Sequence, residues 1–134
     1  LIKASDFDIV IIHDAQRPLT NVSQFQRVLT ALTGDYEAAR PSTAFTETLK
    51  VVNGNNELTR TIDRTKVRRI STPEVIRKSA IDLASTKETS WFLPLKNLAK
   101  TIEVDADPES LRINEANEIA MAESFLVWQQ RISR

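Results

Sequence analysis

Short apolar runs alternate with amphipathic segments along this chain, and the pattern predicts a mixed α/β fold. The β-branched run Ile9–Ile12 contains no polar residue, which is typical of a strand buried on both faces of a sheet. Further strands are expected at 36–40, 67–71, 101–104 and 111–113. We expect Pro41 to close the first of these, because proline cannot donate a hydrogen bond to a neighbouring strand.

Four segments show helical spacing or helix-start signals. The first follows a cap at Thr20 or Asn21 and stops near Gly34, and a short helix is expected at 91–99. Thr72-Pro73-Glu74 combines a cap, a first-turn proline and an acidic residue, so a helix is expected to start there, and Asn114 is expected to cap the last one. The predicted core-facing positions are Val22, Phe25, Leu29 and Leu32, then Ile76, Ala80, Leu83 and Ala84, and finally Ile119, Ala122, Phe125 and Leu126.

A β-hairpin is the clearest local prediction. The alternating stretches 46–52 and 57–63 flank the turn Asn53–Asn56, and Asn-Gly between two such stretches is a strong hairpin signal. Both faces are mostly polar, and an isolated two-stranded ribbon is marginal in water. We therefore interpret residues 1–134 as one α/β unit with an extended β-arm at about 44–64, which packs on its own domain or on a partner subunit.

Composition narrows the possible functions. Lys and Arg together number 18, as do Asp and Glu, so the net charge gives no attraction to nucleic acid or to an anionic membrane. No apolar run approaches the ~20 residues of a membrane span. The chain contains no cysteine, which is consistent with a cytoplasmic protein. Met121 is the only methionine, so we expect these residues to be part of a longer protein whose N-terminal part is missing here.

Polar residues directly after the first strand are the strongest candidates for chemistry. Asp14 and Arg17 stand where open α/β sheets bind ligands, and could hold a metal or sugar hydroxyl and an anionic phosphate respectively. A surface turn with a local ion pair is the alternative explanation of the same spacing. His13, the only histidine, is expected to be a structural group rather than a base.

A second cluster, Arg64, Arg68 and Arg69, suits phosphate binding or a solvated face equally. Thr48 taken alone indicates only strand propensity.

The ordered motifs together resemble one enzyme family. His13-Asp14-Ala15-Gln16-Arg17-Pro18, Thr46-Glu47-Thr48-Leu49-Lys50, the Asn-Gly hairpin, Thr61-Ile62-Asp63-Arg64, Ser71-Thr72-Pro73-Glu74 and Asp107-Pro108-Glu109-Ser110-Leu111-Arg112-Ile113-Asn114 follow in one order. This order is similar to that of the 2-C-methyl-D-erythritol 4-phosphate cytidylyltransferases of the non-mevalonate isoprenoid pathway. The resemblance implies a nucleotide-diphospho-sugar-transferase-like (Rossmann-like) sheet with helices on both faces and a β-arm that exchanges across a homodimer.

The resemblance also implies a reaction and its residues. CMP would pass from CTP to methylerythritol phosphate with Mg²⁺ present and pyrophosphate released. Asp14 and Arg17 would form the centre of the site, with Asp14 near the metal, and Arg112 would stand where the family usually has a lysine. Thr48 and Arg64 would reach from one subunit's arm to the substrate phosphate in the other subunit.

The glycine-rich loop that holds the triphosphate in the family is not present, since Gly34 and Gly54 are the only glycines. These residues alone are therefore expected to be inactive. Glu74 replaces an expected glutamine, and Glu88–Ser90 departs from the family's Thr-Asp-Glu. Two alternatives stay open: a cytidylyltransferase for another polyol phosphate such as ribitol 5-phosphate, or a non-catalytic homologue that dimerises through its arm.

Overall fold

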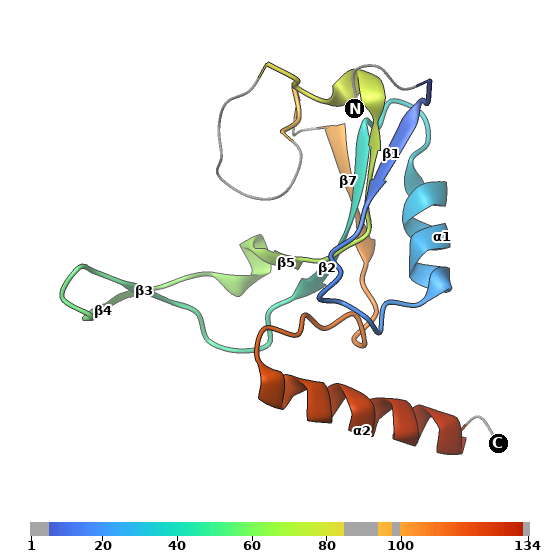
Figure 1. The fold of residues 1–134 in the computed structure, drawn as a ribbon. Helices are drawn as coiled ribbons and strands as arrows, with labels where there is room; N and C mark the ends of the chain where they lie inside the picture. Colours follow the sequence, from blue (N-terminus) through green and yellow to red (C-terminus); the bar gives the residue numbers. More distant parts are fainter. Residues whose placement is uncertain (1–5, 85–93, 98–99, 133–134) are drawn as a thin grey trace.

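The computed structural model describes residues 6–84, 94–97 and 100–132. The elements along the chain are β1 (Ile9–Ile12), α1 (Val22–Ala31), β2 (Ala38–Ala44), β3 (Lys50–Val52), β4 (Leu58–Thr61), η1 (Arg64–Lys66), β5 (Arg68–Ile70), β6 (Glu74–Arg77), η2 (Lys78–Ala80), β7 (Thr101–Asp105) and α2 (Ala116–Ile132). Five strands form one sheet in the order β1-β6-β2-β5, and β7 pairs with β2 in parallel (Figure 1). The expected α/β class is therefore confirmed.

Strand β2 is the centre of the sheet, because it pairs with three other strands. It meets β6 through Ala38 and Ala39 and then β5 from Ser42 onward. The prediction that Pro41 closes this strand is wrong. The carbonyl of Pro41 accepts a hydrogen bond from the Ser71 N–H (2.8 Å), where the partner changes from β6 to β5. Proline has no backbone N–H, and the nitrogen of Pro41 faces the place where the neighbouring strand changes. The proline therefore removes no hydrogen bond between paired strands there.

Helix α1 covers one face of the sheet. Asn21 caps it, since its side chain accepts a hydrogen bond from the Gln24 N–H. The buried residues Val28 and Leu32 pack against the sheet, whereas Val22 is 70% exposed. The predicted apolar face was therefore displaced, because polar Gln24 occupies a buried position of this helix. Gly34 lies beyond the helix end, in a turn with φ of +55°.

The opposite face is covered by the segment after β6. Ile76 packs there with Ala38, Ala80 and Ile81, which places the short helix η2 on this face. The predicted helix starting at Thr72-Pro73-Glu74 is wrong: Glu74–Arg77 is a strand, preceded by a cis Thr72–Pro73 bond. Val75 and Ile76 are fully buried in a strand paired on both edges, and this tertiary environment overrides the local start signal.

Strand β1 pairs with β6 alone among the described residues, so it lies at an edge of the sheet. Ile9 is 37% and Ile11 46% exposed. The strand was predicted correctly, but its burial on both faces was not. Ile11 stands opposite Val75, on the face that carries α1, and is only partly covered there.

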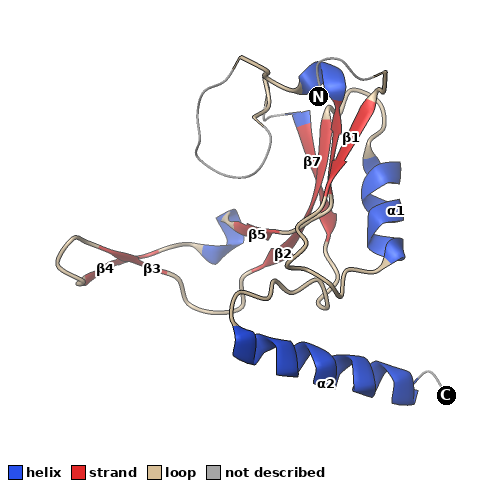
Figure 2. Cartoon of the chain, viewed as in Figure 1, coloured by secondary structure: helices blue, strands red, loops and turns tan. Residues whose placement is uncertain are grey.

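The predicted hairpin is confirmed as the two-stranded sheet β3–β4 (Figure 2). Its turn is closed by Asn53, whose side-chain oxygen accepts hydrogen bonds from the N–H groups of Asn55 and Glu57. Asn56 takes the left-handed conformation in this turn (φ 62°). Figure 1 shows the arm extending away from the five-stranded sheet.

Helix α2 follows a long loop and lies apart from the sheet (Figure 1). None of its residues is buried. Of the predicted inward face, Ala122 and Phe125 are half-buried, whereas Ile119 and Leu126 are exposed. Asn114 is not its cap: the Glu118 carboxylate accepts hydrogen bonds from the Asn114 and Glu115 N–H groups instead. The segment 111–113 is a loop rather than a strand.

Two expectations fall wholly or partly outside the described residues: the altered Glu88–Ser90 motif and most of the predicted helix at 91–99. Within the latter, Leu95 forms a β-bridge with Ile81. No helix in the described part of the chain is long and apolar enough to cross a membrane.

Candidate functional site

Asp14 is fixed in the loop that follows β1. Its Oδ1 accepts a hydrogen bond from the Gln16 N–H (3.0 Å), and its own N–H donates to the Thr72 hydroxyl (3.2 Å). The backbone N–H of Arg17 closes the turn on the Asp14 carbonyl (2.9 Å). The carboxylate is therefore held by the turn itself and by the strand connection at Thr72.

Arg17 is almost completely buried, with 8% of its surface exposed. Its Nη1 donates to the Ser110 carbonyl (2.6 Å), and its Nε lies 3.8 Å from Asp14 Oδ2. Burial lowers the pKa of Arg17, the Asp14 carboxylate raises it, and the nearby Arg112 and Arg69 guanidiniums lower it again. Arginine stays protonated in proteins, so this shift indicates a desolvated positive charge that a bound anion would stabilise.

Arg112 reaches Asp14 from the loop between β7 and α2. Its Nε donates to Asp14 Oδ2 (2.9 Å), and its terminal nitrogens donate to the side-chain oxygens of Gln16 and Asn114. The structure thus brings Asp14, Arg17 and Arg112 together, although 98 residues separate the first from the last. Two guanidiniums share one carboxylate, so the trio carries a net charge of +1.

A buried polar cluster holds the loop after β1 against the loop between β7 and α2. The Ser110 hydroxyl contacts the hydroxyls of Thr20 (2.8 Å) and Ser71 (3.0 Å) and the Gln24 amide (3.3 Å). Gln24 Nε2 also donates to the Thr72 carbonyl (2.7 Å). Sequence reasoning missed this cluster, because single serine, threonine and glutamine residues give no local signal of burial.

His13 is held by Thr72 and Arg17, as expected for a structural group. Its Nδ1 contacts the Thr72 hydroxyl (3.1 Å) and its Nε2 the Arg17 carbonyl (3.3 Å). The ring also packs on Phe25, with centroids 5.0 Å apart.

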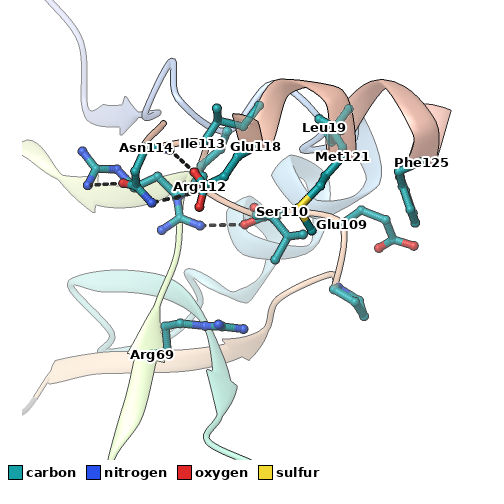
Figure 3. A pocket seen from close by; sticks show the side chains of 14 residues that line it. Leu19, Arg69, Glu109, Ser110, Arg112, Ile113, Asn114, Glu118, Met121 and Phe125 are labelled. Atoms are coloured by element: carbon teal, nitrogen blue, oxygen red, sulfur yellow. Dashed lines mark hydrogen bonds between the residues drawn. The ribbon is translucent and has the colours of Figure 1, made fainter. Parts of the chain in front are cut away.

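A cavity of about 790 Å³ opens beside this trio (Figure 3). Arg17, Arg69 and Arg112 give it a basic side. The rest of the lining is largely apolar and includes Leu19 from the loop before α1 and Met121, Ala122 and Phe125 from α2. The arrangement suits a ligand that is anionic at one end.

The two arm residues lie elsewhere. Arg64 belongs to η1, donates to the Thr46 carbonyl and lines a separate cavity of about 390 Å³ at the base of the arm. Thr48 is exposed just before β3. Neither lines the cavity beside Asp14, so within one subunit the structure does not bring them to that site.

A preformed metal site is absent from the described residues, where no three His, Cys, Asp or Glu side chains cluster. Asp14 is the only carboxylate of the trio, and both of its oxygens accept hydrogen bonds. These two oxygen atoms alone do not fit a divalent cation that stays bound without substrate. At a site with few protein ligands, Mg²⁺ usually binds one or two carboxylates and completes its coordination with substrate phosphates and water.

Comparisons with known proteins agree on one family. Residues 1–127 match the model described as "IspD: 2-C-methyl-D-erythritol 4-phosphate cytidylyltransferase". A bifunctional enzyme IspD/IspF of Oleidesulfovibrio alaskensis is 29% identical over 130 residues, which is 90% of this chain and 32% of that protein. A 2-C-methyl-D-erythritol 4-phosphate cytidylyltransferase of Pseudomonas putida is 33% identical over 81 residues, or 60% of this chain and 34% of that protein.

Solved structures show the same fold. A 4-diphosphocytidyl-2C-methyl-D-erythritol synthase from Anaerococcus prevotii superposes with a TM-score of 0.71 at 22% identity, over 93% of this chain and 62% of that one. A 2-C-methyl-D-erythritol 4-phosphate cytidylyltransferase from Thermus thermophilus also gives 0.71 at 21% identity, over 93% and 65%. The chain spans about a third of the two relatives above and under two thirds of these two structures.

Proposed function

Because the chain belongs to the 2-C-methyl-D-erythritol 4-phosphate cytidylyltransferase (IspD) family, we propose that the intact protein transfers CMP from CTP to 2-C-methyl-D-erythritol 4-phosphate. In this proposal residues 1–134 form one partial cytidylyltransferase domain, with the arm at about 44–64. A cytoplasmic location is also part of the proposal, and a chain without cysteine is compatible with it.

The cluster of Asp14, Arg17 and Arg112 beside the cavity is the observation that supports this function most. In the reaction an oxygen of the acceptor phosphate forms a bond to the α-phosphorus of CTP. The bond from that phosphorus to the bridging oxygen of the β-phosphate breaks, and pyrophosphate leaves. Two polyanions must meet, so positioning and charge neutralisation are what the protein has to supply.

Each residue of the cluster has a distinct task in this scheme. Arg17, held by the Ser110 carbonyl, presents a desolvated positive charge at a fixed place. Arg112 is more exposed and bonded to Asp14, so it can turn part of its guanidinium toward an incoming phosphate. Asp14 orients both guanidiniums and is the proposed protein ligand for Mg²⁺ that arrives with CTP, where the ion would neutralise phosphate charge.

The arm residues are proposed to act across a homodimer. Thr48 and Arg64 lie on or beside an arm that extends away from its own sheet (Figure 1). An exposed two-stranded ribbon is only marginally stable in water, which supports a partner subunit that packs against it. In this arrangement Thr48 and Arg64 of one subunit bind the acceptor phosphate in the cavity of the other.

Pyrophosphate release by the intact protein tests the function. CTP and Mg²⁺ are supplied with methylerythritol phosphate, ribitol 5-phosphate or erythritol 4-phosphate in separate reactions. The highest kcat/KM with methylerythritol phosphate is expected. A preference for ribitol 5-phosphate would mean that this compound, and not methylerythritol phosphate, is the acceptor. No pyrophosphate release with any of the three compounds would refute the enzyme activity. Calorimetry with CTP then separates an inactive nucleotide-binding homologue from a protein with no nucleotide site.

A further inference from the structure

Arg69 is a third arginine beside the cavity. It lies on β5, whose neighbour β2 runs on into the arm, and it approaches the cavity from the sheet rather than from the loops that carry Arg17 and Arg112 (Figure 3). It stands opposite Thr43 in the pairing of these strands.

Arg69 forms no ion pair within the described residues, although its charge acts on the exposed Glu47 carboxylate and helps to lower the pKa of that group. Its Nε donates to the Thr43 hydroxyl (3.1 Å), which leaves the two terminal nitrogens without a hydrogen bond in that part of the chain. Arg17 and Arg112, by contrast, share Asp14.

Among the residues that line the cavity, Arg69 adds a third guanidinium to those of Arg17 and Arg112. Two glutamates also line the cavity, but they face other groups. Glu118 binds the backbone at the start of α2, and Figure 3 shows Glu109 on the side near Phe125. The basic side of the cavity therefore suits an anionic group such as a phosphate monoester.

We propose that Arg69 binds the acceptor phosphate from within the same subunit and thereby makes a phosphate monoester the required acceptor. This inference rests on the proposed function and adds to it a residue of the same subunit. A guanidinium with both terminal nitrogens available can bind two phosphate oxygens side by side, which a lysine cannot do.

The acceptor phosphate fits this position better than the triphosphate of CTP does. By the family resemblance, a glycine-rich loop outside these residues holds the triphosphate, which leaves the arginines beside the cavity for the acceptor phosphate. The charge of Arg69 lowers the pKa of Arg17, because the two guanidiniums repel each other. One phosphate placed between them would relieve this repulsion.

Steady-state kinetics of the intact protein test the proposal, with Arg69→Ala, Arg69→Lys and Arg131→Ala compared with wild type. Arg131 lies at the exposed end of α2 and serves as the matched control. For Arg69→Ala we expect kcat/KM for the acceptor phosphate to fall by about 10- to 100-fold, while KM for CTP changes by less than about threefold. Arg69→Lys should give an intermediate loss and Arg131→Ala none. An unchanged acceptor KM in Arg69→Ala, or an equal rise for CTP, would overturn the proposal.

A binding measurement separates this proposal from the proposed function. If wild type turns over none of the polyol phosphates, the function fails, and calorimetry with inorganic phosphate then tests Arg69 directly. Wild-type binding that weakens at least tenfold in Arg69→Ala and by a smaller factor in Arg69→Lys, but not in Arg131→Ala, would support a phosphate site at Arg69. Equal binding by all variants, or none by wild type at millimolar phosphate, would refute it.

Discussion

The Glu74 carboxylate is fully buried in β6, and its replacement by glutamine tests how its ion pair with Arg40 contributes to stability. Glu74 Oε1 accepts a hydrogen bond from Arg40 Nε (2.6 Å), whereas Oε2 has no hydrogen-bond partner in the described part of the chain. Burial raises the pKa of Glu74, and the Arg40 charge only partly opposes that shift. Glutamine has nearly the same shape and is the residue that the family resemblance leads one to expect here.

Two opposing terms set the magnitude. Unit charges about 4 Å apart attract by about 4 kcal/mol at an effective dielectric constant near 20. Removing a carboxylate from water costs several kcal/mol, so the two terms nearly cancel. We therefore expect the free energy of unfolding of Glu74→Gln to lie within about 1 kcal/mol of wild type near pH 7. Glu74→Leu should lose about 3–5 kcal/mol, because the Arg40 side chain is only 15% exposed and leucine, unlike glutamine, offers its guanidinium no oxygen at this position.

The pH dependence follows from the direction of the pKa shift. A carboxyl group whose pKa is raised by folding favours the folded state when it is protonated, and this contribution is lost as the pH rises through the folded pKa. Wild type should therefore gain stability relative to Glu74→Gln as the pH falls from about 7 to about 4. Urea unfolding of the intact protein at several pH values measures this difference. A loss in Glu74→Gln as large as in Glu74→Leu, or a difference that does not change with pH, would refute the reasoning.

Three further predictions concern the core, the polar cluster and the arm. Ile76→Ala should lower the free energy of unfolding by about 2–5 kcal/mol and Ile76→Val by only about 0.5–1.5, because Ile76 is fully buried in the sheet; equal losses in the urea titration would contradict this. Ser110→Ala removes a hydroxyl with three side-chain partners, two of them buried, and should cost about 1–3 kcal/mol in the same titration, whereas a neutral result would mean that water replaces it. If the arm acts across a dimer, mixing inactive Asp14→Asn with inactive Arg64→Ala should restore about a quarter of wild-type pyrophosphate release, since half of randomly paired dimers are mixed and each has one intact site. No recovery after confirmed subunit exchange would place Arg64 outside the partner's site.

Local signals predicted the parts of the fold that depend on local physics. The Asn-Gly turn specifies its own hairpin, and the run Ile9–Ile12 is a strand in the structure as well. The segment after Thr72 was mistaken for a helix, because cap and proline signals are local whereas its pairing with β1 and β2 joins distant segments. The burial of Pro41 inside β2 likewise depends on where its partner strands change, which spacing does not reveal.

The residues of the candidate site also differ in how far local sequence signals predicted them. Asp14 and Arg17 were found because they follow a strand directly, and Arg112 was found only through the family resemblance. Arg69 was visible as one member of a basic cluster, but its place beside the cavity depends on the pairing of β5 with β2. Ser110 and Gln24 were missed, since nothing next to them in the sequence indicates that both are buried.

The outer edge of β1 has a practical consequence for anyone who prepares this protein. Within the described residues no strand pairs with the outer edge of β1, and its Ile9 and Ile11 side chains are exposed, so another extended chain can add there. Any preparation that leaves this edge uncovered should self-associate in a concentration-dependent way, and light scattering would reveal it before any assay is attempted. Ile9→Lys should reduce this association, because a charged side chain on an edge strand opposes the addition of another strand.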